Sequence, residues 1–187
     1  MDSQPDRPLT LYTIGHSHCA PDEFIAHLIQ HSVTVLVDVR SVPFSRRFPH
    51  FRRDALRTLL HEHGIRYSSA GEKLGGRPQD ETVYVDDHVD YEAVMRQAWY
   101  RDGIARLLEI VAETAQQGGQ VAILCSEGDP RHCHRHHLIA KSLLTDEASL
   151  RATDQPVQVR HILRDGTLEA PLAAAEFRST PEQTRLW

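Results

Sequence analysis

The chain has 187 residues, of which 40% are hydrophobic and 25% are charged, a composition typical of a globular protein that can bury a core. Its net charge of −5 argues against a surface coated with positive charge, and no apolar run approaches the roughly 20 residues that a membrane helix needs. Three cysteines, an odd number, argue against a disulfide framework, and the N-terminus lacks the apolar region of a signal peptide. We therefore expect a cytoplasmic protein with reduced cysteines.

In chain order, the hydrophobic patterns predict a strand at residues 9–14, a helix at 21–29, a strand at 33–39, a helix at 55–60, a strand at 65–67, a helix at 91–117, a strand at 121–124, a helix after Pro130 and a strand at 157–163. The run 33–39 is rich in β-branched residues without polar alternation, which is typical of a central parallel strand buried on both faces. Because strands alternate with helices, we predict an α/β fold with three layers, in which helices cover both faces of a mostly parallel sheet.

Proline and glycine mark the expected interruptions of these elements. Pro43 and Pro49 predict irregular chain after the second strand. Residues 68–90 show little periodicity and form the longest expected loop, and loops of this length are often functional or mobile. The pair Asp102-Gly103 suggests a break within the helix predicted at 91–117.

We expect a single domain over residues 1–187, since no segment has the composition of a linker. Residues 1–8 are expected to form a disordered N-terminal extension. Asp165-Gly166 predicts a turn, and residues 166–187 form a C-terminal extension that is helix-prone at 172–177 and otherwise has no predicted structure.

The run from Leu124 to His137 holds two of the three cysteines and four of the thirteen histidines. It joins a strand pattern to a helical pattern, and α/β proteins often bind ligands at such a junction. Asp129 is a good N-cap and Pro130 a good first helical residue, so the next backbone N–H groups are expected to form an anion site together with the helix dipole. Cys125 lies just before that site, where a thiolate would be stabilised.

Three of the predicted strands end in polar residues. Because the carboxyl ends of parallel strands meet at one edge of a sheet, we expect these residues to share one site. The first strand is followed by His16 and Ser17, the second ends in Asp38 and is followed by Arg40, Ser45 and Arg46, and the late strand is followed by Cys125 and Glu127.

Several short motifs follow one another along roughly residues 10–165. They are Thr13-Ile14-Gly15-His16-Ser17, Asp38-Val39-Arg40 with Pro43 and Ser45, Tyr67, Leu74-Gly75-Gly76, and Cys125-x-Glu127 with Cys133-His134-Arg135. In this order and spacing they resemble a family of uncharacterised bacterial and archaeal proteins, domain of unknown function 488. The resemblance implies an α/β fold with a polar site at the strand ends, and it implies no settled activity.

The catalytic candidates are Cys125, Glu127, Cys133, His134 and His16. A thiolate would serve as nucleophile, and Glu127 could act as a general base or orient a histidine. The candidates for substrate or anion binding are Ser17, Asp38, Arg40, Ser45, Arg46 and Arg135. Arg40 and Arg135 could clamp a phosphate in fork geometry. Structural alternatives are that the cysteines are small buried residues and that Asp38 and Arg40 form an ion pair.

No residue is assigned as a metal ligand, and no cofactor is predicted. A zinc or iron site that uses Cys125, Cys133, His16 and His134 is nevertheless an alternative. The spacing from Cys125 to Arg131 also matches the loop of cysteine phosphatases. Two acids inside that loop would repel a phosphate, which weighs against this interpretation.

The leading hypothesis is an enzyme, hydrolase- or transferase-like, that acts on a phosphate-bearing small molecule or nucleic acid. One alternative is a non-catalytic nucleic-acid-binding module that uses the six arginines of Arg40–Arg57, with phenylalanines that stack bases or instead anchor the loop in the core. Another is a metal or redox-sensing Cys/His site. No membrane partner is expected, and no oligomeric state is predicted. We predict that Cys125→Ser and Arg135→Ala abolish activity without unfolding the protein.

Overall fold

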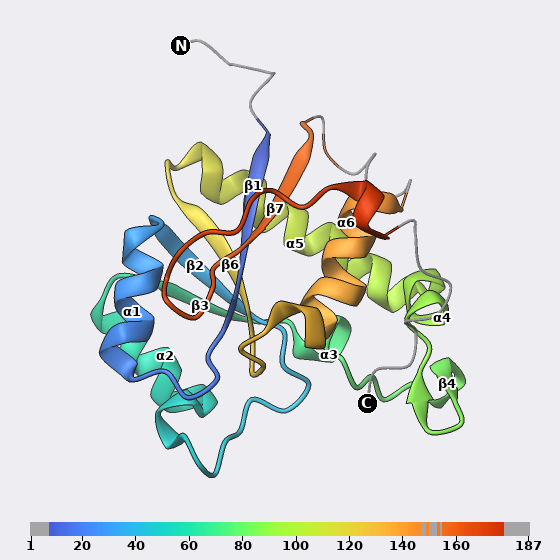
Figure 1. Ribbon diagram of the computed structural model, residues 1–187, viewed down its shortest axis with the longest axis horizontal. Coiled ribbons are helices and arrows are strands. Elements are labelled where there is room, and N and C mark those ends of the chain that lie inside the picture. The colour runs from blue at the N-terminus through green and yellow to red at the C-terminus, as the bar shows by residue number, and fades with distance from the viewer. Residues whose placement is uncertain (1–7, 147–148, 150–152, 154, 178–187) are drawn as a thin grey trace.

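The computed structural model describes residues 8–146, 149, 153 and 155–177. Five parallel strands form one sheet in the spatial order β3-β2-β6-β1-β7 (Figure 1). They are β1 (Leu9–Gly15), β2 (Val33–Asp38), β3 (Arg66–Ser69), β6 (Gln120–Cys125) and β7 (Val157–His161). Residues 1–7 of the predicted N-terminal extension and 178–187 of the C-terminal extension lie outside the described residues.

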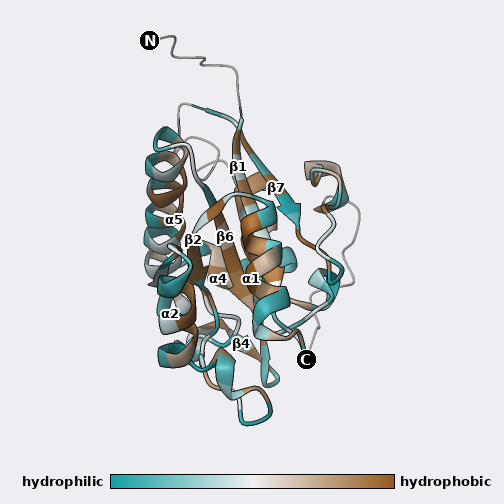
Figure 2. Ribbon diagram, turned by 90° about the vertical axis from the view of Figure 1, so that its left-hand side faces the viewer, coloured by the Kyte–Doolittle hydropathy of each residue, from teal (hydrophilic) through white to brown (hydrophobic). Residues whose placement is uncertain are grey.

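Helices cover both faces of the sheet, which confirms the predicted α/β fold with three layers. One face packs against α1 (Pro21–Gln30) and α2 (Arg53–Glu62). The other face packs against α3 (Gly71–Leu74), α4 (Tyr91–Arg96), α5 (Ala98–Gln116), a π-helical segment (Arg135–Ala140) and α6 (Lys141–Thr145). In Figure 2, α1 and α5 lie on opposite sides of the strands.

The apolar strands are buried on both faces. In β2, Val35 and Val37 pack toward α5, whereas Leu36 packs toward α1 and α2. In β6, Ile123 packs toward α5 and Ala122 toward the opposite face. This two-sided burial explains why both runs lack polar alternation. The middle strand is β6, and β2 lies between β6 and the edge strand β3.

The prediction that residues 68–90 form an irregular loop is wrong. The segment contains α3, a 3-10 turn (Glu81–Val83) and an antiparallel hairpin of β4 (Tyr84–Val85) and β5 (His88–Val89). The hairpin turn is made by Asp86 and Asp87, which both have positive φ (49° and 64°). Aspartate tolerates this conformation, which two-residue hairpin turns require. Each element is too short to produce a recognisable hydrophobic period.

The helix predicted at 91–117 is two helices, and the break lies at Gln97 rather than at Asp102-Gly103. Gln97 is extended (ψ 137°) and separates α4 from α5. Gly103 lies inside α5, where a Cβ would come within 2.8 Å of Lys73 and 2.9 Å of Leu74. This glycine therefore permits close packing of α5 on α3 instead of ending a helix.

The helix predicted to begin after Pro130 begins later. The Asp129 carboxylate accepts a hydrogen bond from the Arg131 N–H (2.9 Å), as expected for an N-cap, but it caps only a 3-10 turn (Pro130–His132). Cys133 is extended (φ −138°, ψ 145°), and helical structure resumes at His134. Its first turn is closed by the Cys133 carbonyl, which accepts from the N–H groups of both His136 and His137.

The predicted turn at Asp165-Gly166 is confirmed, with Gly166 at φ 79° and a hydrogen bond from the Leu163 N–H to the Thr167 carbonyl. The last strand ends at His161, two residues earlier than predicted, and a 3-10 turn (Ala174–Phe177) lies in the helix-prone tail.

Within the part of the chain that is described, no helix is long and apolar enough to cross a membrane.

A buried chain of hydrogen bonds ties β1 and β7 to the π-helical segment. Thr13 Oγ1 lies 2.7 Å from His161 Nδ1, and His161 Nε2 lies 3.0 Å from His136 Nδ1. Both contacts can be hydrogen bonds when each imidazole is neutral and donates from one of its two ring nitrogens. Burial lowers the pKa of His161 to about 3 and that of His136 to about 4, so the pair is uncharged near neutral pH.

This pair predicts that the protein loses stability in mild acid. The unfolded chain binds protons at both histidines below about pH 6.5, whereas the folded chain does so only near pH 4 and 3, so the free energy of unfolding falls as pH drops from about 6.5 toward 4. Urea unfolding at pH 7 and pH 5 measures this difference. The difference should shrink in His161→Gln and stay unchanged in His132→Gln, whose side chain is 67% exposed. Equal pH dependence in all three proteins would contradict this account.

Candidate functional site

The carboxyl ends of β1, β2 and β6 lie side by side at one edge of the sheet (Figure 1). Gly15 at the end of β1 is opposite Cys125 of β6, and Asp38 at the end of β2 is opposite Leu124. The chain leaves β1 and β2 toward helices on one face, but it leaves β6 toward the π-helical segment on the other. A reversal of this kind opens a crevice at the strand ends, which is the usual ligand site of open α/β sheets.

Two cysteines and a histidine meet in this crevice. The Sγ atoms of Cys125 and Cys133 lie 2.8 Å apart, and His134 Nδ1 lies 3.7 Å from each of them. His134 Nε2 is 3.2 Å from the Val39 carbonyl at the end of β2. An N–H at Nε2 donates to that carbonyl, which directs Nδ1 at the two sulfurs. We call Cys125, Cys133 and His134 the thiol cluster.

The two thiols differ in acidity because of their contact. The Cys133 S–H donates to Cys125, which, with His134 nearby, lowers the pKa of Cys125 well below its usual value. Burial, together with the same hydrogen bond, raises the pKa of Cys133. The contact therefore makes Cys125 the more acidic thiol of the pair and Cys133 the less acidic one.

The thiol cluster opens onto a cleft of about 540 Å³. The residues that line it are Arg40, Ser41, Val42, Gly76, Arg77, Tyr91, Cys125, Ser126, Glu127, His132, Cys133, His134 and His137. Gly76 packs against the His134 ring so closely that a Cβ would lie 2.8 Å from Nδ1. This contact gives a physical reason for glycine in the Leu74-Gly75-Gly76 motif, because a side chain there would displace the imidazole from the sulfurs.

Arg40 is held by a buried ion pair with Asp38. Its Nε and Nη2 donate to the two carboxylate oxygens of Asp38 (2.9 and 2.6 Å), and its Nη1 donates to the Phe51 carbonyl (2.8 Å). The Tyr67 hydroxyl donates to the same carboxylate at 2.9 Å. The charge of Arg40 is thus balanced inside the protein, which favours the structural ion pair over a phosphate clamp.

Arg135 lies behind the cleft and is completely buried. Its guanidinium donates to the carbonyls of Glu127 and Gly128 in the loop that follows β6. Glu127 and the Arg135 guanidinium both lie next to Gly15 of β1. Arg135 therefore braces the loop that carries Glu127, and Arg135→Ala is expected to lower stability as well as activity.

His16 lies beside the thiol cluster and has one unused ring nitrogen. Its Nδ1 is 2.9 Å from the Ser17 carbonyl, its ring stacks on Phe51 at 4.2 Å, and its backbone N–H donates to the Cys125 carbonyl. Burial lowers its pKa to about 4, so the ring is neutral at pH 7. Nε2 is buried and has no hydrogen-bond partner among the described residues, and His16 is not among the residues that line the cleft.

Five of the six candidates for anion binding do not line the cleft, namely Ser17, Asp38, Ser45, Arg46 and Arg135. Ser17 has positive φ (43°), and its hydroxyl pairs with the His18 ring. The Ser45 hydroxyl accepts from the Phe48 N–H, which stabilises a turn, and Arg46 is exposed. Arg131, whose spacing from Cys125 matches the loop of cysteine phosphatases, forms a salt bridge with Glu169.

A family model described as a domain of unknown function, DUF488, matches residues 20–142, which is more than half of the chain. The chain belongs to the DUF488 family. The resemblance inferred from the motifs is thereby confirmed, and the matched segment includes the whole thiol cluster. No curated protein and no solved structure matches the chain. Since the family description states no activity, the function of this DUF488 protein has to be argued from its site.

The thiol cluster is also the group that could hold a metal ion, since its three ligand atoms lie within 4.8 Å of one another. Two thiolates bound to one zinc ion at about 2.3 Å in tetrahedral geometry lie about 3.8 Å apart. The sulfurs of Cys125 and Cys133 are closer than that, at 2.8 Å. The arrangement therefore fits direct contact between two thiols better than two thiolates that share an ion.

Several residues of the cleft were not predicted from the sequence of this DUF488 chain. Arg77 is exposed at the cleft, where its backbone N–H donates to the Ser41 hydroxyl, and Tyr91 and His132 also line the wall. Arg77 follows directly after the Gly75-Gly76 motif, and that proximity was its only signal in the sequence. Tyr91 comes from α4 and has no local signal, whereas His132 lies in the 3-10 turn and belongs to the histidine-rich run that ends at His137.

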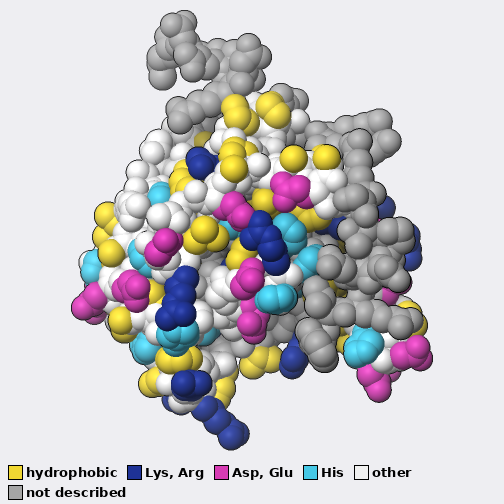
Figure 3. Space-filling model, viewed as in Figure 1, with side chains coloured by type: hydrophobic (Ala, Val, Ile, Leu, Met, Phe, Trp, Pro, Cys, Tyr) yellow, Lys and Arg dark blue, Asp and Glu magenta, His cyan; other side chains and the backbone are white. Residues whose placement is uncertain are grey.

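The arginine segment is divided between the core and the surface, since Arg40 is buried whereas Arg46, Arg47, Arg52, Arg53 and Arg57 are exposed. Arg40 is buried, Phe51 lies in the core, and Arg52 lies over the exposed Phe44 ring at 4.7 Å. On the face shown in Figure 3, cationic, acidic and histidine side chains of the described residues are interspersed. The phenylalanine in the core supports the interpretation that this segment is anchored to the fold, with Phe44 as the exposed exception.

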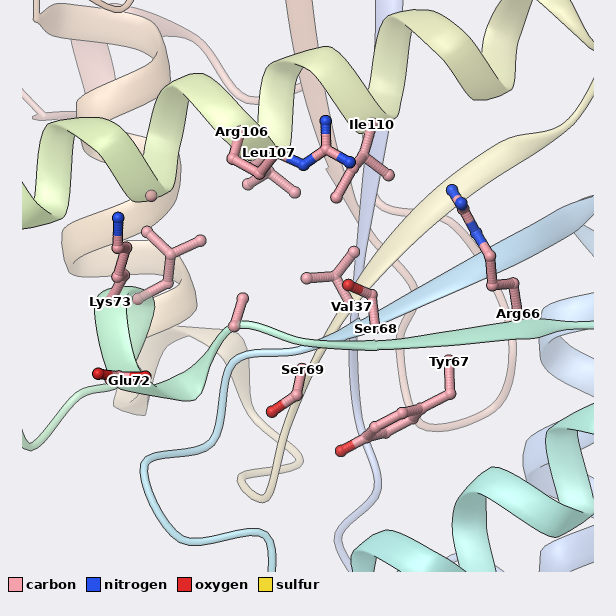
Figure 4. A pocket seen from close by; sticks show the side chains of 13 residues that line it. Val37, Arg66, Tyr67, Ser68, Ser69, Glu72, Lys73, Arg106, Leu107 and Ile110 are labelled. Atoms are coloured by element: carbon pink, nitrogen blue, oxygen red, sulfur yellow. The ribbon is translucent and has the colours of Figure 1, made fainter.

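A second cavity, of about 440 Å³, lies between the edge strand β3 and α5 (Figure 4). Arg66 and Ser68 point into the space below α5, whereas Tyr67 points to the other side of the strand. Two of the cations at this cavity are paired, Lys73 with Asp102 and Arg106 with Glu109. No cysteine or histidine is among its described lining residues. Of these two cavities, the cleft at the thiol cluster is the one lined by cysteine and histidine.

Proposed function

We propose that this DUF488 protein is a thiol-dependent enzyme that acts on a phosphate-bearing substrate, a nucleotide or nucleic acid, bound in the cleft at the strand ends. The observation that carries the proposal is the contact of Cys125 with Cys133 and His134 at the wall of a cleft of about 540 Å³. A thiolate that is held ready by a neighbouring donor and faces a ligand-sized cleft is the usual form of a cysteine nucleophile.

In this scheme the Cys125 thiolate forms a bond to the electrophilic atom of the substrate, and the bond from that atom to the leaving group breaks. The leaving group departs with the electron pair and takes a proton from the Cys133–His134 pair. Water in a hydrolase, or an acceptor in a transferase, then displaces the sulfur, gives its proton back to the Cys133–His134 pair and restores the thiolate.

The groups suited to bind the phosphate are cationic side chains of the cleft wall that are not already paired with an acidic side chain. Arg77 is exposed there, whereas His132 pairs with Asp129 and His137 contacts the Arg131 carbonyl. Arg40 contributes less to phosphate binding, because its guanidinium already donates two hydrogen bonds to the Asp38 carboxylate. Glu127 is the acidic residue of the lining and is the candidate general base.

The first test is the reactivity of Cys125. At pH 6.5 we expect iodoacetamide to alkylate Cys125 fastest in the wild type and at least about tenfold more slowly in Cys133→Ala, which removes the S–H donor. Peptide mass spectrometry measures both rates. Cys19 is the internal control, since burial and the Glu23 carboxylate raise its pKa to about 12 and it should remain unmodified. An alkylation rate that does not change in Cys133→Ala would contradict the proposed activation.

The second test is turnover. Phosphate release or product formation from a panel of nucleotides and short oligonucleotides should be lost in Cys125→Ser and retained in Cys19→Ser. Nucleic-acid binding that survives Cys125→Ser and weakens steeply with salt would instead support the binding module of Arg40–Arg57. About one zinc or iron ion per purified chain, lost in Cys125→Ser, would support a metal centre.

A further inference from the structure

The sulfurs of Cys125 and Cys133 are almost close enough to bond. They are 2.8 Å apart, so the formation of a disulfide, at about 2.05 Å, requires an approach of about 0.8 Å. Both cysteines are free thiols, and they lie eight positions apart in the sequence. The extended conformation of Cys133 at the start of the helix turns its side chain back toward the end of β6.

The pair is reached from the cleft. Cys125 and Cys133 line it and are 6% and 5% exposed. A hydroperoxide that enters the cleft is small enough to reach a sulfur at its wall. The third cysteine, Cys19, lies on the α1 side and donates to the Glu23 carboxylate, so it does not compete for a bond with Cys125.

We propose that Cys125 and Cys133 form a peroxide-reactive modification site, in which a hydroperoxide converts the pair to a reversible intramolecular disulfide that blocks the nucleophile. This inference rests on the proposed function in one respect, namely that Cys125 is the group whose loss stops turnover. The pair resembles other sensitive sites in that an accessible thiolate has a second cysteine next to it.

The chemistry balances in two steps. The Cys125 thiolate attacks the terminal oxygen of the hydroperoxide, the O–O bond breaks, and the departing alkoxide or hydroxide takes a proton, which leaves a sulfenic acid on Cys125. The Cys133 sulfur then attacks the sulfenyl sulfur, the S–O bond breaks, and the hydroxide leaves as water with the proton of Cys133. The two thiols lose two electrons and the hydroperoxide gains them, and an added dithiol reverses the change.

The experiment uses the full chain, fully reduced and then exposed to hydrogen peroxide in slight excess. Intact-mass and peptide analysis should show the loss of two hydrogens and a link between the peptides of Cys125 and Cys133, reversed by dithiothreitol. Cys133→Ser should stop at the sulfenic acid, which dimedone traps on Cys125. Cys19→Ser is the matched control and should behave as the wild type.

Three results would overturn the inference. These are an unchanged mass at peroxide levels that oxidise free cysteine, a disulfide that joins Cys19 or two chains, and a tightly held metal ion that must be removed before any oxidation occurs. The readout is independent of turnover. Disulfide formation in a protein whose Cys125→Ser variant keeps its activity would contradict the proposed function alone, and full dependence on Cys125 without a disulfide would contradict this inference alone.

Discussion

Replacement of Gly15 by alanine is expected to destabilise the protein by more than about 3 kcal/mol. A Cβ on Gly15 would overlap the Glu127 carbonyl oxygen and Arg135 Nη1. The first neighbour is backbone, which cannot rotate away, and the second belongs to a buried side chain. The loop after β6 would have to move, and its contacts with Arg135 would be lost together with the position of Glu127.

Urea unfolding of the full chain at pH 7 measures this effect. Gly64→Ala is the matched control, because Gly64 has positive φ (70°) but no atom would lie within 4 Å of a Cβ added to it. That variant should lose only about 1 kcal/mol, the usual conformational cost of alanine in the left-handed region. If both variants lose a similar free energy of unfolding, Gly15 is not needed for the close approach of β1 to the loop after β6.

Arg135→Ala is expected to lower the free energy of unfolding by about 3–5 kcal/mol. The substitution leaves the carbonyls of Glu127 and Gly128 without their donors and opens a cavity at a fully buried position. The sequence alone predicts that this variant loses activity without unfolding, whereas the buried position of Arg135 predicts a loss of stability as well. The difference arises because a buried arginine that binds backbone carbonyls supports the fold.

The matched control is Arg131→Ala, four positions earlier. Arg131 is 51% exposed and pairs with Glu169 at the surface, so its loss should cost at most about 1 kcal/mol. Thermal or urea unfolding compares the two variants. If Arg135→Ala unfolds at the wild-type midpoint but no longer binds nucleotides, Arg135 contacts the ligand and the role of brace assigned to it is wrong.

Much of the fold follows from local patterns in the sequence. The β-branched run that begins at Val33 and the apolar run that begins at Val121 lack polar alternation because both faces of their strands are buried. The alternation of such strands with helices predicts a parallel sheet, and a parallel sheet brings His16, Arg40 and Cys125 to one edge. The family relationship was likewise visible in short motifs.

Shorter elements could not be predicted in this way. The hairpin of β4 and β5 has two residues in each strand, too few to show a period. The extended residue Gln97 has no local signal that distinguishes it from the helical residues around it, whereas Gly103 suggested a break that does not exist. Gly103 serves a contact with α3, and that contact joins residues far apart in the sequence.

The sequence by itself determined the layered α/β architecture, the edge of the sheet where polar residues gather, and the membership of the DUF488 family, since each depends on order and periodicity along the chain. Only the tertiary structure decided what those polar residues do. Arg40 and Arg135 were indistinguishable from phosphate ligands until Asp38 and the Glu127 carbonyl were seen to engage them. The contact between Cys125 and Cys133 depends in the same way on the turn and the extended residue between β6 and the helix, because the role of a charged or nucleophilic side chain is set by the partners that folding brings to it.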